Sequence, residues 1–241
     1  MIPSSWWRKL ILAVFILGMG GGFMWLATVA APGPSSEVFA QAIAGIAFLL
    51  SFYAGTPVFA RFLAPEASKN EAMQQRLRQF AETMPGSCPI FLYENKDKNA
   101  NTVGIVPAHS KVYITTGLME RISDEGLRGV LAHENTHVRE HHILVTATYA
   151  CTYALVAHLT NNSHLFVSGF LAFMTLRRHL EYRADAGGAK LVGKEVMTKG
   201  LKELNSIYPS KWWERWLVFL TSYPTLPMRL KALETGKKTL F

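Results

Sequence analysis

Charged residues are scarce in this chain of 241 residues, and long stretches lack them almost entirely. They make up 17% of the sequence, against about 25% in a typical soluble domain, while hydrophobic residues make up 49%. Lysine and arginine are absent between residues 10 and 60 and between residues 143 and 176. A single soluble core does not explain apolar blocks of this length. We therefore expect several membrane helices beside a small catalytic domain.

Cysteine is also rare, and no nucleic-acid-binding motif is present. Cys88 and Cys151 lie far apart and lack a Cys-x-x-Cys partner, which indicates free thiols in a reducing compartment. The net charge is +8, from 25 basic and 17 acidic residues, but the basic residues do not cluster with stacking aromatic residues. We expect no nucleic-acid partner. Attraction to anionic lipid headgroups explains the charge more simply.

Two apolar runs are long enough to span a bilayer. Residues 10–31 form an uncharged run, and residues 38–60 form a second run that only small or polar residues interrupt. Each exceeds the roughly 20 residues that a spanning helix needs. The first run is too long for the hydrophobic part of a signal peptide, and Pro32 would block cleavage after it. Residues 1–63 are therefore predicted to be a retained transmembrane hairpin.

Two shorter apolar runs, at residues 143–159 and 165–176, leave three alternatives open. They can cross the membrane by extending their flanking helices, enter it as a re-entrant hairpin, or pack as a soluble helical pair. We favour a membrane-embedded hairpin at residues 143–176. Basic residues flank the apolar runs at Arg8, Arg61 and Arg177, whereas the connectors "PGPSSE" and "TNNSH" contain none. This distribution predicts that the connectors face outward and the rest of the chain faces the cytoplasm.

The sequence between and after these runs predicts a small sheet among helices. A polar amphipathic helix is expected over residues 66–84, and "IFLYEN" and "NTVGIVPAHSKVYITTG" predict three short strands, the last two joined at residues 107–110. Ser123 is a plausible N-cap of a helix that we expect to run on into the third apolar run. "KWWERW", residues 211–216, fits either an interfacial segment or an amphipathic core helix.

The stretch "HENTHVREHH", residues 133–142, carries four of the eight histidines. On a helix, His133 and His137 present their rings to the same point, which is the geometry that two zinc ligands require. Glu134 can reach a water molecule beside the metal without binding the metal itself, as a general base must. His141 lies one turn beyond His137, too far along a straight helix to reach the same ion, and His142 points elsewhere.

The third ligand must come from outside this helix. A third histidine at ligand spacing would have to stand at Ile143, so that class of site is excluded. The better candidate is Glu181, which lies 44 residues beyond His137, leaving room for a helical excursion out and back. Asp185, one turn further, is placed to hold a ligand imidazole through its second nitrogen.

"VLAHENTHV" and "EYRADAGGA", with an N-terminal membrane hairpin, make the chain resemble the HtpX-like integral-membrane zinc metallopeptidases. That family is related to the type I CAAX prenyl proteases and the OMA-type proteases. The resemblance spans roughly residues 5–235 and implies a mainly α fold, with membrane helices and a gluzincin-like catalytic domain at residues 64–241 that contains a small β-sheet. It implies one Zn²⁺ per chain on His133, His137 and Glu181, with Glu134 as base and Asp185 as orienting residue. "NANTVGIVPAHSKVYITTGLM" is similar to the family segment whose edge strand pairs with the substrate backbone.

The C-terminal part departs from the family pattern. The family usually has Ser-x-His-Pro followed by an arginine, and these residues lie close to the zinc. "TSYPTLPMRL" keeps Pro224 and Arg229 but has Tyr223 in place of the histidine. Tyr223 is then either a hydrogen-bond donor to a developing oxyanion or a core tyrosine. The resemblance assigns Arg229 a place beside the reacting centre.

The expected function is zinc-dependent endopeptidase activity in membrane-protein quality control, in an integral protein of the bacterial inner membrane whose catalytic domain faces the cytoplasm. The expected partners are membrane-protein or peptide substrates and the lipid bilayer. Two alternatives stay open: a processing peptidase for one membrane-anchored peptide, and a zinc-bound scaffold or chaperone without catalytic activity, which Tyr223 keeps possible.

Overall fold

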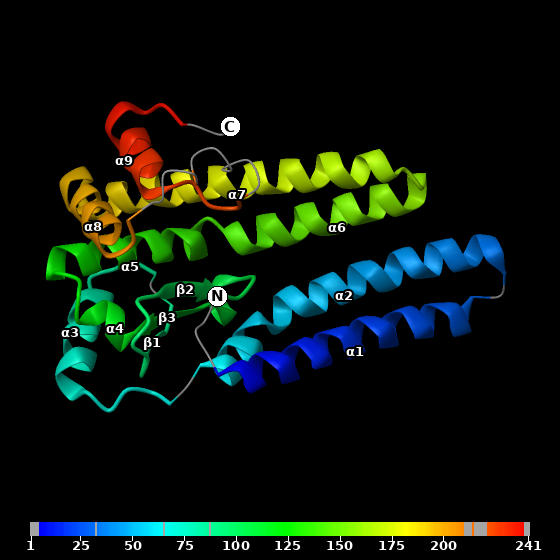
Figure 1. The fold of residues 1–241 in the computed structure, drawn as a ribbon, viewed down its shortest axis with the longest axis horizontal. Coiled ribbons are helices and arrows are strands. Elements are labelled where there is room, and N and C mark those ends of the chain that lie inside the picture. The colour runs from blue at the N-terminus through cyan, green and yellow to red at the C-terminus, as the bar shows by residue number, and fades with distance from the viewer. Residues whose placement is uncertain are drawn as a thin grey trace.

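Two long apolar hairpins extend from one end of the catalytic part in the computed structural model (Figure 1). The structure describes residues 5–31, 33–64, 66–86, 88–209, 214 and 221–238. The first hairpin is α1 (Trp6–Ala30) and α2 (Pro34–Leu63). The second is α6 (His142–Thr160) and the first half of α7 (Ser163–Val192). Within the described residues, α1, α2 and α6 are long and apolar enough to cross a membrane.

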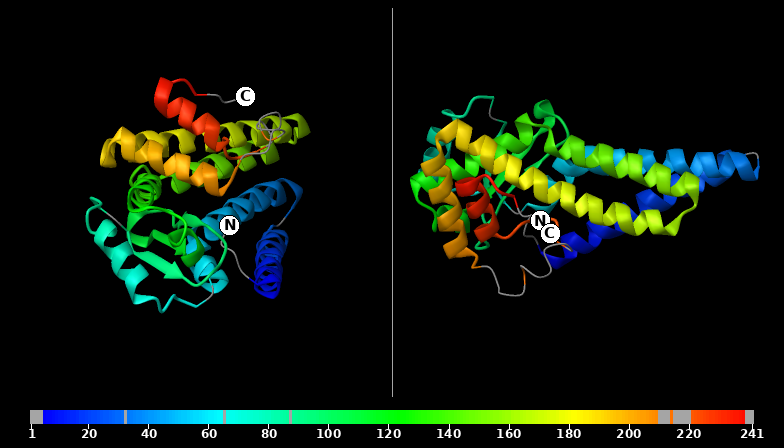
Figure 2. Two further views of the ribbon diagram at one scale, coloured as in Figure 1. Left: turned by 60° about the vertical axis from the view of Figure 1, so that its left-hand side comes forward. Right: turned by 90° about the horizontal axis from the view of Figure 1, so that it is seen from above.

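The two hairpins point the same way. The end of α1, the start of α2 and the turn at Asn161 all lie at the same end of the molecule, and α2 packs along α6 (Figure 2). At the opposite end, the Arg8 guanidinium donates to the carbonyl groups of Phe62 and Ala64, so α1 caps the last turn of α2. The basic residues that flank the apolar runs therefore lie beside the catalytic part, and the connectors that lack them lie far from it.

The helix that carries the histidine motif, α5 (Asp124–Arg139), ends sooner than the sequence predicts. Ser123 is its N-cap, as expected, and accepts a hydrogen bond from the amide of Gly126. His141 then adopts a left-handed conformation with φ 53°, and α6 starts at His142 in a new direction. A non-glycine residue in this conformation costs roughly 1–2 kcal/mol, and neither glycine nor proline marks the break in the sequence. The expectation of one continuous helix is therefore wrong.

The sheet has three strands in the order β1-β3-β2, with β1 (Ile90–Tyr93) parallel and β2 (Ala100–Val103) antiparallel to β3 (Lys111–Thr115). This confirms the predicted strands and the turn between the last two, where η1 (Pro107–His109) lies. A short helix, α4 (Thr116–Met119), follows β3. The strand β2 is at an edge of the sheet and lies against α5.

The helix before the sheet is shorter than predicted. α3 spans Glu71–Ala81 rather than residues 66–84. Ser68 donates its amide to the carbonyl of Leu92, and Ala67 forms a bridge with Tyr93, so this stretch is extended beside β1. Asn70 then caps α3 by accepting from the amide of Met73. The tertiary pairing with β1 outweighs the helical pattern at this end.

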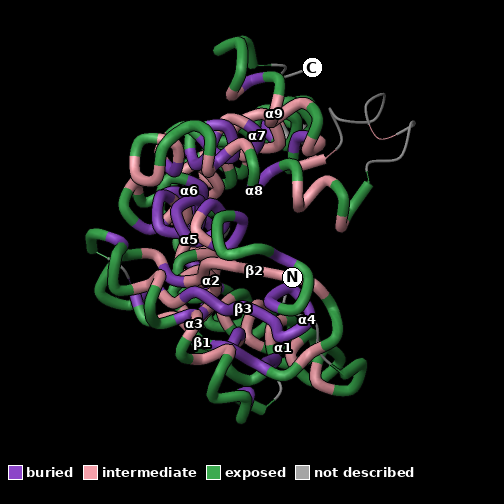
Figure 3. The backbone as a smooth tube through the Cα atoms, turned by 90° about the vertical axis from the view of Figure 1, so that its left-hand side faces the viewer, coloured by how far each residue is buried: buried purple, intermediate pink, exposed green. Residues whose placement is uncertain are grey.

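α5 is the buried centre of the catalytic part (Figure 3). It packs against α7 on one side and α8 (Lys194–Ile207) on another, and α9 (Leu226–Thr235) covers α7 and α8. Its apolar face joins a core with α3, β1 and β3. The expected fold class, mainly α with membrane helices and a small sheet, is confirmed. Of the "KWWERW" stretch only Glu214 is described, so that prediction lies outside the described residues.

Candidate metal centre

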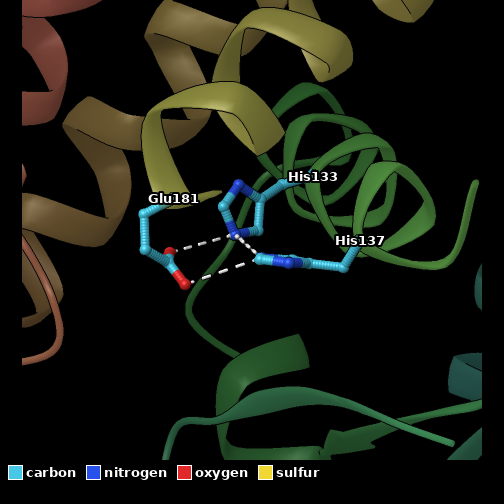
Figure 4. Close-up of side chains that lie close together, drawn as sticks. All are labelled: His133, His137 and Glu181. Carbon is cyan, nitrogen blue, oxygen red and sulfur yellow. Dashed lines mark hydrogen bonds and ion pairs between the residues drawn. The ribbon is translucent and has the colours of Figure 1, made fainter. Parts of the chain in front are cut away.

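Two helices bring the histidine motif and the downstream carboxylates together. His133 and His137 lie one turn apart on α5 and face Glu181 on α7 (Figure 4). The helices approach closely because Gly187 has no side chain: a Cβ atom there would lie 2.3 Å from the Thr136 methyl group. This contact fixes α7 at the height where Glu181 and Asp185 reach the histidines.

The three side chains fit a tetrahedral zinc site. The Nε2 atoms of His133 and His137 are 3.1 Å apart, and the Glu181 carboxylate oxygens lie 3.4 Å and 3.6 Å from them. Ligands at typical zinc distances on the corners of a tetrahedron are about 3.4 Å apart. Two imidazoles and one carboxylate are also a donor set that zinc prefers, and they leave the fourth position to water or substrate.

Asp185 and Arg229 orient His133. Nδ1 of His133 lies 2.9 Å from the Asp185 carboxylate, which can only accept, so this nitrogen carries a proton and Nε2, once it loses its own proton, is the atom that can bind a metal. The Arg229 guanidinium, from α9, holds both oxygens of Asp185 at 2.6 Å and 2.8 Å and lies 3.4 Å from Glu181. Arg229 thus lies beside the site, as the resemblance implies; it contacts the candidate ligand Glu181 directly and is linked to His133 through Asp185.

His142 lies against the second histidine, a contact that the sequence did not predict. His142 was expected to point elsewhere, but it is buried, and its Nδ1 lies 2.9 Å from Nδ1 of His137. The turn at His141 brings the ring back beneath the motif. His141 itself is exposed, and its expected exclusion from the site agrees with this position.

The charges of the site favour a cation. Glu134, Glu181 and Asp185 are buried carboxylates, and Arg229 supplies one positive charge against their three negative charges. Burial lowers the pKa of His137 to about 3, so this ring is neutral. Burial and Arg229 lower the pKa of His133, but hydrogen bonds to Asp185 and Glu181 raise it more, to about 9. A positive charge at this point is therefore stabilised, and a divalent ion would balance the remaining charge.

Glu134 lines the same cleft and accepts a hydrogen bond from the edge strand. The Thr102 hydroxyl, on β2, donates to Oε2 of Glu134 over 2.5 Å. Burial raises the pKa of Glu134, while the charge of His133 and the hydrogen bond from Thr102 oppose this rise. A raised pKa suits a group that must accept a proton near neutral pH. Thr102 lies 32 residues from Glu134, and no sequence spacing links them.

Tyr223 lies at the mouth of the cleft, and the core alternative is wrong because the residue is 54% exposed. The Arg177 guanidinium donates to its hydroxyl over 2.7 Å and stacks on its ring. The next residue, Arg178, is buried and donates to the carbonyl of Thr221. The two arginines thus hold the segment that carries Tyr223 against α7.

The cleft has a volume of about 510 Å³. The helices α5, α7 and α8 line it together with β2, and the apolar hairpins contribute Tyr53 from α2 and Thr146 from α6. The metal centre therefore lies where the catalytic part meets the two hairpins.

The model of peptidase family M48 matches residues 67–237. A protease HtpX homolog of Thermodesulfovibrio yellowstonii is 27% identical over 208 residues, which are 72% of this chain and 73% of the relative. Protease HtpX of Legionella pneumophila is 30% identical over 189 residues, which are 67% of this chain and 68% of the relative. The crystal structure of S. mikatae Ste24p matches 94% of this chain with a TM-score of 0.62 at 18% identity. This chain spans 64% of that larger protein, so the likeness concerns the fold.

Proposed function

Because the chain belongs to peptidase family M48, we propose that it is a zinc-dependent endopeptidase that removes damaged or misassembled membrane proteins. The chain is an integral-membrane metallopeptidase, a conclusion that rests on the family, the relatives and the apolar helices. To this we add one Zn²⁺ per chain as the metal and membrane proteins as the substrates. We also propose a location in the bacterial inner membrane, with residues 64–241 as the peptidase on the cytoplasmic side and residues 1–63 and 143–176 in the bilayer.

The observation that carries this proposal is the convergence of two imidazole nitrogens and a carboxylate on one point, with Glu134 in the same cleft. His133, His137 and Glu181 would hold the metal. Zinc, when bound, contributes Lewis acidity toward the scissile carbonyl and the attacking water. Glu134 accepts the proton of that water and can pass it to the leaving amine.

The edge strand β2 is the proposed place for the substrate backbone. Its outer edge lies along the cleft, and an extended peptide that pairs with it is held by backbone hydrogen bonds, which tolerate varied sequences. Thr102, in the middle of this strand, holds the base at the same time. The strand that would bind the substrate therefore also holds the group that would accept the proton.

The residues that line the cleft favour membrane proteins as substrates. Tyr53 lies ten residues before the end of α2, which is about 15 Å along the helix, and Thr146 belongs to the first turns of α6. A polypeptide that leaves the bilayer beside these helices reaches the metal centre without crossing open water.

The test is cleavage of an unfolded membrane-protein substrate by the purified protein in detergent, with Glu134→Gln compared at equal zinc content. We expect Glu134→Gln to retain stoichiometric zinc and to lose activity by about 10²- to 10⁴-fold. Glu125→Gln, the same substitution at an exposed position of the same helix, should cut like the wild type. Unchanged cleavage by Glu134→Gln, or wild-type protein that binds no zinc, would overturn the proposal.

A further inference from the structure

We propose that His142 is a positioning residue for the metal, and that the break in the helix at His141 puts it in place. His142 would hold the ring of His137 so that Nε2 of His137 faces the ion. This inference rests on the proposed zinc site, and it concerns a residue that does not itself touch the metal.

The contacts of His142 form a chain from the protein surface to a metal ligand. Its Nδ1 lies 2.9 Å from Nδ1 of His137, and its Nε2 lies 3.1 Å from Oε2 of Glu140. Arg183 donates to the same oxygen of Glu140 over 2.7 Å. The Glu140 and Arg183 side chains are partly exposed, at 32% and 54%, whereas His142 is 3% exposed.

The direction of these hydrogen bonds decides which nitrogen of His137 is free. The Glu140 carboxylate can only accept, so Nε2 of His142 carries the ring's proton and donates. Nδ1 of His142 then accepts from Nδ1 of His137. The lone pair of His137 is left on Nε2, the atom that lies 3.1 Å from Nε2 of His133. Each proposed histidine ligand thus has its own partner on the second nitrogen, Asp185 for His133 and His142 for His137.

A continuous helix would not allow this contact. Residues five apart on a helix point about 140° away from each other, so residue 142 would face away from His137. The left-handed conformation of His141 redirects the chain, and the rings of His137 and His142 meet edge to face with centroids 4.8 Å apart. Arg183 reaches across from α7, where it stands between Glu181 and Asp185, and fixes the break through Glu140.

Three substitutions separate the hydrogen bond from the shape of the ring. In His142→Asn, the amide oxygen takes the place of Nδ1 and can still accept from His137. In His142→Gln, the amide reaches the place of Nε2 and keeps only the contact with Glu140. In His142→Phe, the ring remains and both hydrogen bonds are lost. His141→Asn is the control, because this neighbour is exposed and asparagine tolerates the left-handed conformation.

The measurement is the zinc dissociation constant of the full chain in detergent, by competition with a chromophoric chelator. Loss of an orienting partner typically weakens metal binding by about 10- to 100-fold, and we expect this for His142→Gln and His142→Phe. His142→Asn and His141→Asn should stay within about threefold of the wild type. The thermal unfolding midpoint of chelator-treated protein shows whether a variant is folded; we expect His142→Gln to match the wild type there.

Wild-type zinc affinity in both His142→Gln and His142→Phe would overturn the role of His142. So would an affinity of His142→Asn as weak as that of His142→Phe, because the hydrogen bond would then not be the cause. If the wild-type protein cuts substrate with bound zinc while these variants bind zinc normally, only this inference fails. If the wild-type protein binds no zinc at all, the proposed function fails with it.

Discussion

A single hydroxyl group connects the edge strand to the proposed base. Because Thr102 donates to Glu134 and also stands in β2, its substitution tests whether the base must be held by the strand. Thr102→Val keeps the shape and the strand propensity but removes the donor. A hydrogen bond to a charged group contributes about 1.5–3 kcal/mol, so we expect kcat to fall by about 10- to 100-fold with little change in KM.

Thr102→Ser restores the donor and should recover most of the wild-type kcat, which steady-state kinetics on a peptide substrate will show. A rise in KM alone, with kcat unchanged in Thr102→Val, would mean that Thr102 serves the strand and not the base.

At the scale of single residues, local spacing predicted much and missed what depends on tertiary contacts. His133 and His137 stand one helical turn apart, as do Glu181 and Asp185, so each pair could be recognised from the sequence. Thr102 and His142 could not. Thr102 reaches Glu134 only because the sheet packs on α5, and His142 reaches His137 only because the chain turns at His141.

The site depends on the packing of α7 against α5. At Gly187 the two helices lie too close together to leave room for a side chain. Gly187→Ala would put a methyl group against Thr136, and overpacking of this kind costs about 1–3 kcal/mol. We expect the thermal unfolding midpoint in detergent to fall by about 2 to 12 °C. Adding Thr136→Ser, which removes the clashing methyl group, should recover part of this loss.

Gly45→Ala on α2 is the matched control, because a Cβ atom there meets nothing within 4 Å. If the thermal unfolding midpoint of Gly187→Ala equalled that of the wild type, α7 could move away from α5 without cost, and the close packing at Gly187 would not be needed.

At the scale of helices and strands, the periodicity of the sequence predicted the elements where the chain is regular. The observed elements differ from the predicted ones where tertiary contacts compete with local preference. The helices of the apolar runs and the three strands were predicted correctly. The start of α3 was not, because residues 67 and 68 pair with β1, and neither was the end of α5, because histidine at position 141 gives no turn signal.

At the scale of the whole molecule, the two hairpins predict a definite topology. Gly33 and Thr160 stand at the far connectors, and Lys96 stands on the exposed surface of the catalytic part. Cysteines introduced at these three positions, in a chain with Cys88→Ala and Cys151→Ala, can be labelled with a membrane-impermeant maleimide on intact spheroplasts. We expect labelling at Gly33→Cys and Thr160→Cys, and labelling at Lys96→Cys only after lysis.

If Thr160→Cys were labelled only after lysis while Gly33→Cys was labelled on intact spheroplasts, the first hairpin would cross the bilayer and the hairpin of α6 and α7 would not. Labelling of Lys96→Cys on intact spheroplasts would place the metal centre on the outer side.

The contact between α2 and the sheet has a mechanical consequence. The amide of Gly104, directly after β2, donates to the Thr56 hydroxyl, which in turn donates to the carbonyl of Tyr53 in α2. A helix whose apolar length exceeds the local bilayer thickness tilts to bury its ends. Because Thr56 joins α2 to the end of β2, such a tilt also moves the strand that holds the proposed base. We therefore expect the thickness of the surrounding membrane to affect the position of the proposed base, with no ligand and no change in sequence.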